Sequence, residues 1–102
     1  MDEKEKYRRQ DMEIIFSQHA FQQMFKKNIL PKDVKRLLPI AEVIKDYPDD
    51  KPYPSKLLLG FVNDDVPLHI VAAYNYADMQ VIVITAYIPD GELWSNNFKT
   101  KK

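Results

Sequence analysis

Three closely spaced runs near the C-terminal end constrain the fold most. They are rich in Val, Ile, Leu, Tyr and Thr, lack helical spacing, and cover Leu57–Val62, Leu68–Tyr76 and Gln80–Ile88. Short polar segments suited to turns separate them, because Asn and Asp readily adopt turn conformations. β-Branched and aromatic residues favour strands, and such short connections join antiparallel neighbours. Together with the alternating run Ala41–Tyr47, these segments predict a four-stranded antiparallel β-meander.

Two short helices are expected before the meander. Ser17 suits an N-cap for a helix from about Gln18 to Asn28, and Pro31 suits the first turn of a second helix that Pro39 must end. Apolar residues recur at helical spacing, namely Phe21, Met24 and Phe25 in the first and Val34, Leu37 and Leu38 in the second. The fold class predicted is therefore α+β, with both helices packed on one face of the meander. Before them, Glu13–Phe16 suits either an edge strand or a lead-in to the first helix.

The second face of the sheet is expected to be functional or covered. Strict alternation puts Ile82, Ile84, Ala86 and Ile88 on one face of the last strand, and Val81, Val83, Thr85 and Tyr87 on the other. Neither face is fully polar. We therefore expect a binding or dimerisation surface, or cover by the tail through Trp94 and Phe98.

Composition limits the domain organisation and the class of protein. The 102 residues suit one domain over 13–94, with a polar N-terminal extension over 1–12 and a basic C-terminal tail over 95–102. The chain has no cysteine, no signal-peptide pattern and no apolar run long enough for a membrane span, so we expect a cytoplasmic protein with no membrane contact. Net charge is zero, yet residues 17–45 carry six Lys and Arg against two acidic residues. That basic half either contacts phosphates or an acidic partner, or is a solvated helix face.

Two histidines and a lysine are the candidates for chemistry. His19 lies in the first turn of the first helix, where the dipole favours a neutral imidazole, and His69 lies within a strand. Paired histidines suit acid–base cleavage of a phosphodiester, and Lys56 would stabilise the phosphorane. A structural role for each histidine is the alternative. Two histidines alone are too few for a zinc site, the acidic loop lacks calcium-loop spacing, and two glycines form no phosphate loop, so no metal or other cofactor is expected.

Four ordered segments carry a family resemblance. They read FSQHAFQQM, VIKDYPDDKPYPSKLLLG, PLHIVAAY and VIVITAYIPD followed by LW, and span roughly Ile14 to Trp94. This pattern resembles the bacterial and archaeal family known as domain of unknown function 4258, which looks related to the RelE-like toxin superfamily. The resemblance implies a RelE/barnase-like fold and an mRNA-cleaving toxin inhibited by a cognate antitoxin protein. The family-matching positions are His19, Lys56, His69, Thr85 and Tyr87.

The sequence therefore supports three hypotheses. The first is a metal-independent endoribonuclease of a toxin–antitoxin module, acting on RNA or on the ribosome. Its catalytic candidates are His19, Lys56, His69 and Tyr87, and its RNA-binding candidates are Lys26, Lys27, Lys35, Arg36, Thr85 and Trp94. The second is a non-catalytic protein- or nucleic-acid-binding module, and the third is a degenerate toxin kept for its structure. A homodimer is compatible with each.

Overall fold

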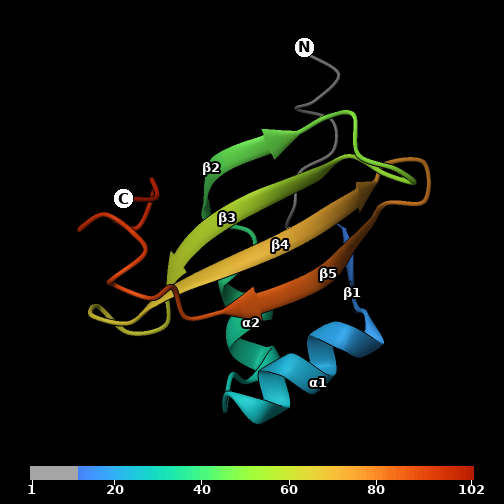
Figure 1. Cartoon of the computed structure of the whole chain (residues 1–102). Helices are drawn as coiled ribbons and strands as arrows, with labels where there is room; N and C mark the ends of the chain where they lie inside the picture. Colours follow the sequence, from blue (N-terminus) through green and yellow to red (C-terminus); the bar gives the residue numbers. More distant parts are fainter. Residues whose placement is uncertain (1–11) are drawn as a thin grey trace.

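The computed structural model describes residues 12–102 (Figure 1). Two helices and five strands follow one another as β1 (Glu13–Phe16), α1 (Gln18–Lys26), α2 (Pro31–Leu37), β2 (Glu42–Tyr47), β3 (Ser55–Phe61), β4 (Pro67–Asn75) and β5 (Gln80–Tyr87). The α+β class, both helices and the four strands of the expected meander are present, with bounds shifted by one or two residues. The polar extension expected over residues 1–12 lies, apart from Met12, outside the described residues.

The sheet itself corrects the prediction of a four-stranded antiparallel meander. It has five strands in the order β1-β5-β4-β3-β2, and it is mixed because β1 pairs with β5 in parallel. Ile14 lies opposite Val81 and Phe16 opposite Val83 in this pair. A four-residue run has no partner nearby in sequence, so only the packing of the whole chain decides that it joins the exposed edge of β5. The long connection that a parallel pair requires runs here through both helices and then through β2, β3 and β4.

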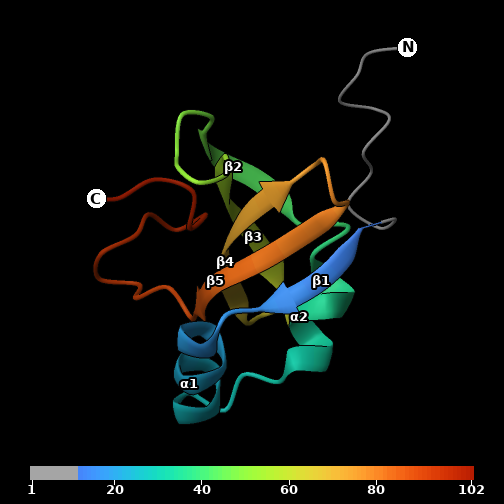
Figure 2. The same cartoon turned by 90° about the vertical axis from the view of Figure 1, so that its right-hand side faces the viewer.

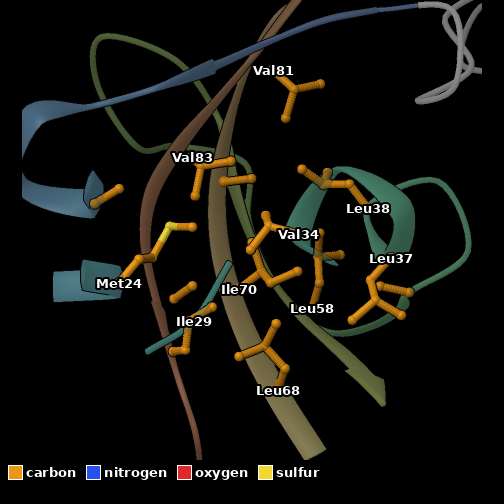
Figure 3. Close-up of a cluster of buried hydrophobic side chains, with 14 of the residues drawn as sticks. Met24, Ile29, Val34, Leu37, Leu38, Leu58, Leu68, Ile70, Val81 and Val83 are labelled. Carbon is orange, nitrogen blue, oxygen red and sulfur yellow. The ribbon is translucent and has the colours of Figure 1, made fainter. Parts of the chain in front are cut away.

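Both helices lie on one face of the sheet, and the C-terminal segment lies on the other (Figure 2). The core between helices and sheet includes Met24 of α1, Val34 and Leu38 of α2, and Leu58 and Ile70 of the sheet (Figure 3). All five side chains are at most 1 % exposed. We call the sheet face that carries the helices the helix face, and the opposite one the open face.

Helix α1 presents a different stripe to the core than its apolar spacing predicted. Ala20 and Met24 are buried, whereas Phe21 is 50 % and Phe25 86 % exposed. Phe21 packs instead against Phe16 of β1, with ring centroids 5.1 Å apart. Small Ala20 permits α1 to approach β5 closely. The predicted apolar face is therefore wrong for Phe21 and Phe25, which turn outward, and confirmed for Met24. In α2, Val34, Leu37 and Leu38 are buried as predicted.

A β-bulge in β5 also breaks the expected alternation of faces. Val71 pairs with Thr85 and Ala72 with Val83, so Ile84 is the extra residue. Strands that alternate strictly cannot place Val83 and Ala86 on one face, yet both are fully buried in the core. The bulge therefore brings Ala86 to the helix face, and leaves Thr85 and Tyr87 on the open face opposite Val71 and His69.

Ser17 joins the start of α1 to this bulge. Its hydroxyl oxygen accepts a hydrogen bond from the backbone N–H of Ala20 at 3.0 Å, as expected for an N-cap. The same hydroxyl donates to the carbonyl oxygen of Ile84 at 3.2 Å. One side chain thus caps the helix and satisfies the bulged strand.

The helices of residues 12–102 are all short, and none has the length and apolar character that crossing a membrane requires.

Candidate functional site

The C-terminal segment covers part of the open face and encloses His69. The His69 side chain is fully buried, although it points away from the helices. The ring of Trp94 meets it edge-on, with centroids 4.4 Å apart and the planes at 90°. The segment is held at the sheet edge by an ion pair of 2.9 Å between Lys99 and Glu42 of β2. Cover by the tail, one of the options that the sequence left open, is therefore present.

Both ring nitrogens of His69 have partners. Nε2 lies 2.7 Å from the carbonyl oxygen of Phe98, and Nδ1 lies 3.2 Å from the hydroxyl of Tyr87. Because a carbonyl oxygen only accepts, Nε2 must carry a proton. Burial lowers the pKa of His69, and the Phe98 carbonyl opposes that shift. The neutral ring then has a lone pair on Nδ1, to which the Tyr87 hydroxyl donates.

This arrangement leaves the oxygen of Tyr87 free to accept a hydrogen bond from a ligand. Burial raises the pKa of Tyr87, and the nearby Tyr47 raises it further, so the phenol keeps its proton near neutral pH. Tyr87 is half-buried and lines an open groove. His69 is buried and does not line this groove, so a ligand there would meet Tyr87 and not His69.

The groove lies on the open face between the C-terminal segment and the β2–β3 side of the sheet, and its volume is about 650 Å³. Its apolar floor includes Leu57 and Val71. Its aromatic and basic lining residues are Tyr47, Tyr87, Trp94, Lys45, Lys99 and Lys101. We call it the open-face groove. In Figure 1 the red C-terminal segment lies to the left of β2.

The lysines of the groove already contact aromatic or acidic side chains. The Nζ atoms of Lys45 and Lys101 lie 5.7 and 5.8 Å from the ring centroids of Tyr47 and Trp94, within cation–π range. Lys99 pairs with Glu42. These contacts place three ammonium groups around a concave surface with two accessible tyrosines.

One carboxylate also lines the open-face groove. Asp50 lies in the turn after β2, and its Oδ2 accepts a hydrogen bond of 2.5 Å from the hydroxyl of Ser55. Ser55 is 2 % exposed and begins β3. The buried hydroxyl of Ser55 thus fixes the position of the Asp50 carboxylate.

The structure does not bring the predicted catalytic residues into one site. His69 and Tyr87 are adjacent on the open face. Lys56 pairs with the core residue Ala72, and so lies on the helix face, where it forms an ion pair of 3.6 Å with Asp46. His19 is exposed on α1, in the helix layer. Side chains alternate between the two faces along β3, and paired residues of β3 and β4 share a face. Lys56 therefore lies on the face opposite to that of His69.

The predicted RNA-binding residues divide in the same way. Thr85 and Trp94 lie on the open face near Tyr87. Lys26 and Lys27 lie at the end of α1, and Lys35 and Arg36 on α2, away from the open-face groove. Arg36 is engaged locally, since it donates to the carbonyl of Val62 at 2.9 Å and pairs with Asp33.

Sequence reasoning missed Lys45, Tyr47, Asp50, Lys99 and Lys101 as residues of one groove. Lys45 and Tyr47 alternate on β2, a signal that they share a face. Cover of this face by the tail was one of the expected options, but nothing in the sequence placed the C-terminal lysines beside Lys45 and Tyr47.

Within residues 12–102, no three His, Asp or Glu side chains converge as a set that would hold a metal ion.

Comparison with known proteins gives one family and no named relative. Neither the curated proteins nor the solved structures provided a match. A family model described as domain of unknown function (DUF4258) matches residues 16–88, which include every strand of the meander as well as His69 and Tyr87. Since this match covers well over half of the chain, the protein belongs to the DUF4258 family.

Proposed function

We propose that this domain binds single-stranded RNA in the open-face groove. The observation that carries the proposal is the set of three lysines and two accessible tyrosines around one concave sheet surface. Ammonium groups bind a phosphate backbone, and tyrosine rings stack on unpaired bases. A single strand presents unpaired bases that can stack on these rings, whereas a duplex keeps its bases paired and stacked on one another.

The lysines of the helix layer provide a matched control. Binding of a labelled short RNA is measured by fluorescence anisotropy between about 50 and 200 mM salt. Lys45→Ala and Lys101→Ala should each weaken binding and reduce the slope of log K against log salt by about 0.7. Lys26→Ala and Lys27→Ala should leave the slope unchanged. The reverse pattern would place the RNA on the helices and overturn the proposal.

A second candidate function, RNA cleavage, is favoured by the hydrogen bond between Tyr87 and His69. In this scheme the 2′-hydroxyl of the bound RNA gives its proton to the Tyr87 oxygen, while the phenolic proton passes to Nδ1 of His69. The 2′-oxygen attacks the adjacent phosphorus, and the 5′-oxygen leaves, taking a proton from a water molecule. The hydroxide formed takes the phenolic proton of Tyr87, whose oxygen regains the proton held on Nδ1 of His69, which restores the starting state. The products are a 2′,3′-cyclic phosphate and a 5′-hydroxyl. Lys99 and Lys101 are the groove cations available to the transition-state charge.

In this scheme the catalytic residues differ from those predicted from the sequence. His19 and Lys56 leave the catalytic set, Tyr87 becomes the catalytic residue, and His69 becomes a positioning residue that also accepts the relayed proton. The RelE-like relationship, a toxin–antitoxin role with an antitoxin protein as partner, and action on the ribosome stay predictions. So does a homodimer. An antitoxin that inhibits such an enzyme would need to cover the open-face groove.

Expression in bacteria and analysis of RNA ends test the cleavage scheme together. Wild-type protein should arrest growth and produce RNA fragments with 5′-hydroxyl ends. His19→Ala should do the same, since His19 lies outside the groove. Intact RNA and normal growth with the wild type would reject cleavage and leave the binding proposal to the anisotropy experiment.

A further inference from the structure

We propose that Asp50 makes the open-face groove selective for guanine, an inference that rests on the RNA-binding function proposed above. Asp50 is an acidic residue among the lysines that line this groove. A carboxylate there works against phosphate binding, because like charges repel. Its presence is accounted for if it contacts a base rather than the backbone.

The Asp50 carboxylate is held in one orientation and still has hydrogen-bond acceptor positions free. Its Oδ2 accepts from the buried hydroxyl of Ser55, and the backbone N–H of Asp50 donates to the carbonyl of Tyr47 at 3.3 Å. Across residues 12–102, the structure gives Oδ1 of Asp50 no hydrogen-bond partner. An ionised carboxylate has about four acceptor positions, so one oxygen is open and the other retains a lone pair.

The chemistry of the bases then selects one of them. The Watson–Crick edge of guanine presents two adjacent donors, the N1–H and the 2-amino group, which match the two oxygens of a carboxylate. Adenine and cytosine present one amino donor beside an acceptor nitrogen that a carboxylate repels. Uracil presents a single N–H between two carbonyl oxygens. Proteins read unpaired RNA bases on this edge while stacking them on aromatic rings.

Neighbouring residues supply the rest of a base site. Tyr47 ends β2 directly before the turn that carries Asp50, and it lines the same groove. Lys45 lies two residues earlier with its ammonium group over the Tyr47 ring. A base stacked on Tyr47 would displace the Lys45 ammonium from the ring, which leaves Lys45 for the phosphate and Asp50 for the edge of the base.

Selectivity is tested with short oligouridylates that carry one central guanosine, adenosine, cytidine or inosine. Wild-type protein should bind the guanosine oligomer about tenfold more tightly than the adenosine and cytidine oligomers. Inosine lacks the 2-amino group and should bind with intermediate affinity. Asp50→Asn should reduce guanosine binding to the adenosine level, and Ser55→Ala should reduce the preference partly. Asp49→Asn, a neighbour outside the groove lining, should keep it.

The outcomes separate this inference from the binding proposal. Equal affinity for the four oligomers, or a guanosine preference that survives Asp50→Asn, overturns guanine selectivity but leaves RNA binding in place. Failure of every oligomer to bind overturns both. The wild-type comparison needs no variant, so a variant that does not fold cannot obscure the result.

Discussion

The Nε2 nitrogen of His69 lies 2.7 Å from the carbonyl oxygen of Phe98, which ties the middle of the sheet to the last residues of the chain. Phe98 has a positive φ of 59°, so the backbone turns sharply where its carbonyl meets the imidazole. Through this bond the C-terminal segment sets the tautomer of His69. The tautomer in turn decides that Tyr87 donates to Nδ1, so the tail determines which way the proton of Tyr87 points.

Stability should fall as the pH drops through the ordinary histidine range. Burial holds the pKa of His69 in the folded protein below the ordinary histidine value of about 6.5, so the unfolded chain binds more protons than the folded one around that pH. The free energy of unfolding should therefore be highest above pH 6.5 and decrease below it, until the folded-state pKa is reached. Urea unfolding at several pH values measures this. His69→Gln should flatten the dependence.

Tyr87→Phe should separate binding from cleavage. The variant keeps the ring that stacks on a base but loses the hydroxyl that accepts the 2′ proton. We expect RNA affinity within about twofold of wild type and cleavage slower by about 100-fold or more. The lost partner of His69 should also cost about 1–3 kcal/mol of stability. Equal cleavage rates at matched RNA occupancy would contradict the assigned role.

Trp94→Ala should loosen the C-terminal segment. Trp94 is 8 % exposed and packs edge-on against His69. Without the indole, water should reach the imidazole, and the pKa of His69 should rise toward its ordinary value. Titration of the histidine by NMR measures this, with Trp94→Phe as the control that keeps an aromatic ring. An unchanged pKa in Trp94→Ala would show that the tail stays closed without the indole.

Ser17→Ala should cost more than removal of a simple N-cap. The hydroxyl caps α1 through Ala20 and also donates to the bulged carbonyl of Ile84. We expect a loss of about 1–2 kcal/mol, at the upper end of the range for caps. Ser17→Thr keeps both hydrogen bonds and is the control. Denaturant unfolding measures the two, and equal stability of Ser17→Ala and wild type would contradict the double role.

Gly60→Val should be destabilising because β3 and α2 meet closely there. A Cβ placed on Gly60 lies 3.3 Å from the Cβ and Cδ1 atoms of Leu37, which is itself buried. We expect a loss of about 1–3 kcal/mol from overpacking. Gly91→Val is the control, because nothing lies within 4 Å of a Cβ there. Similar unfolding free energies for the two variants would contradict this account.

The local chemistry of the chain was sufficient for much of the fold. Ser17 and Pro31 mark helix starts by rules that need only neighbouring residues, and both helices begin where predicted. Four strands followed from β-branched runs and turn residues. Asn28, the approximate end predicted for the first helix, has a φ of 58°, a left-handed conformation typical of residues that follow a helix.

Contacts between segments far apart in the sequence could not be predicted from local residue patterns. The parallel pairing of β1 with β5 depends on where the helices place the chain, and the bulge at Ile84 changes which residues share a face. Strict alternation therefore misplaced Ala86, and apolar spacing misplaced Phe21 and Phe25. In both cases the close packing of whole elements outweighed a local periodicity.

The candidate site, too, was predictable from the sequence only in part. From the sequence, His69 was a candidate because of its imidazole, and the family resemblance added Tyr87. Only the tertiary structure decided that they meet, that Lys56 faces the other side of the sheet, and that the C-terminal lysines complete a groove with Lys45 and Tyr47. The physical reason is register: a strand's composition predicts that it pairs, but the face each side chain shares with distant residues depends on how all the strands align.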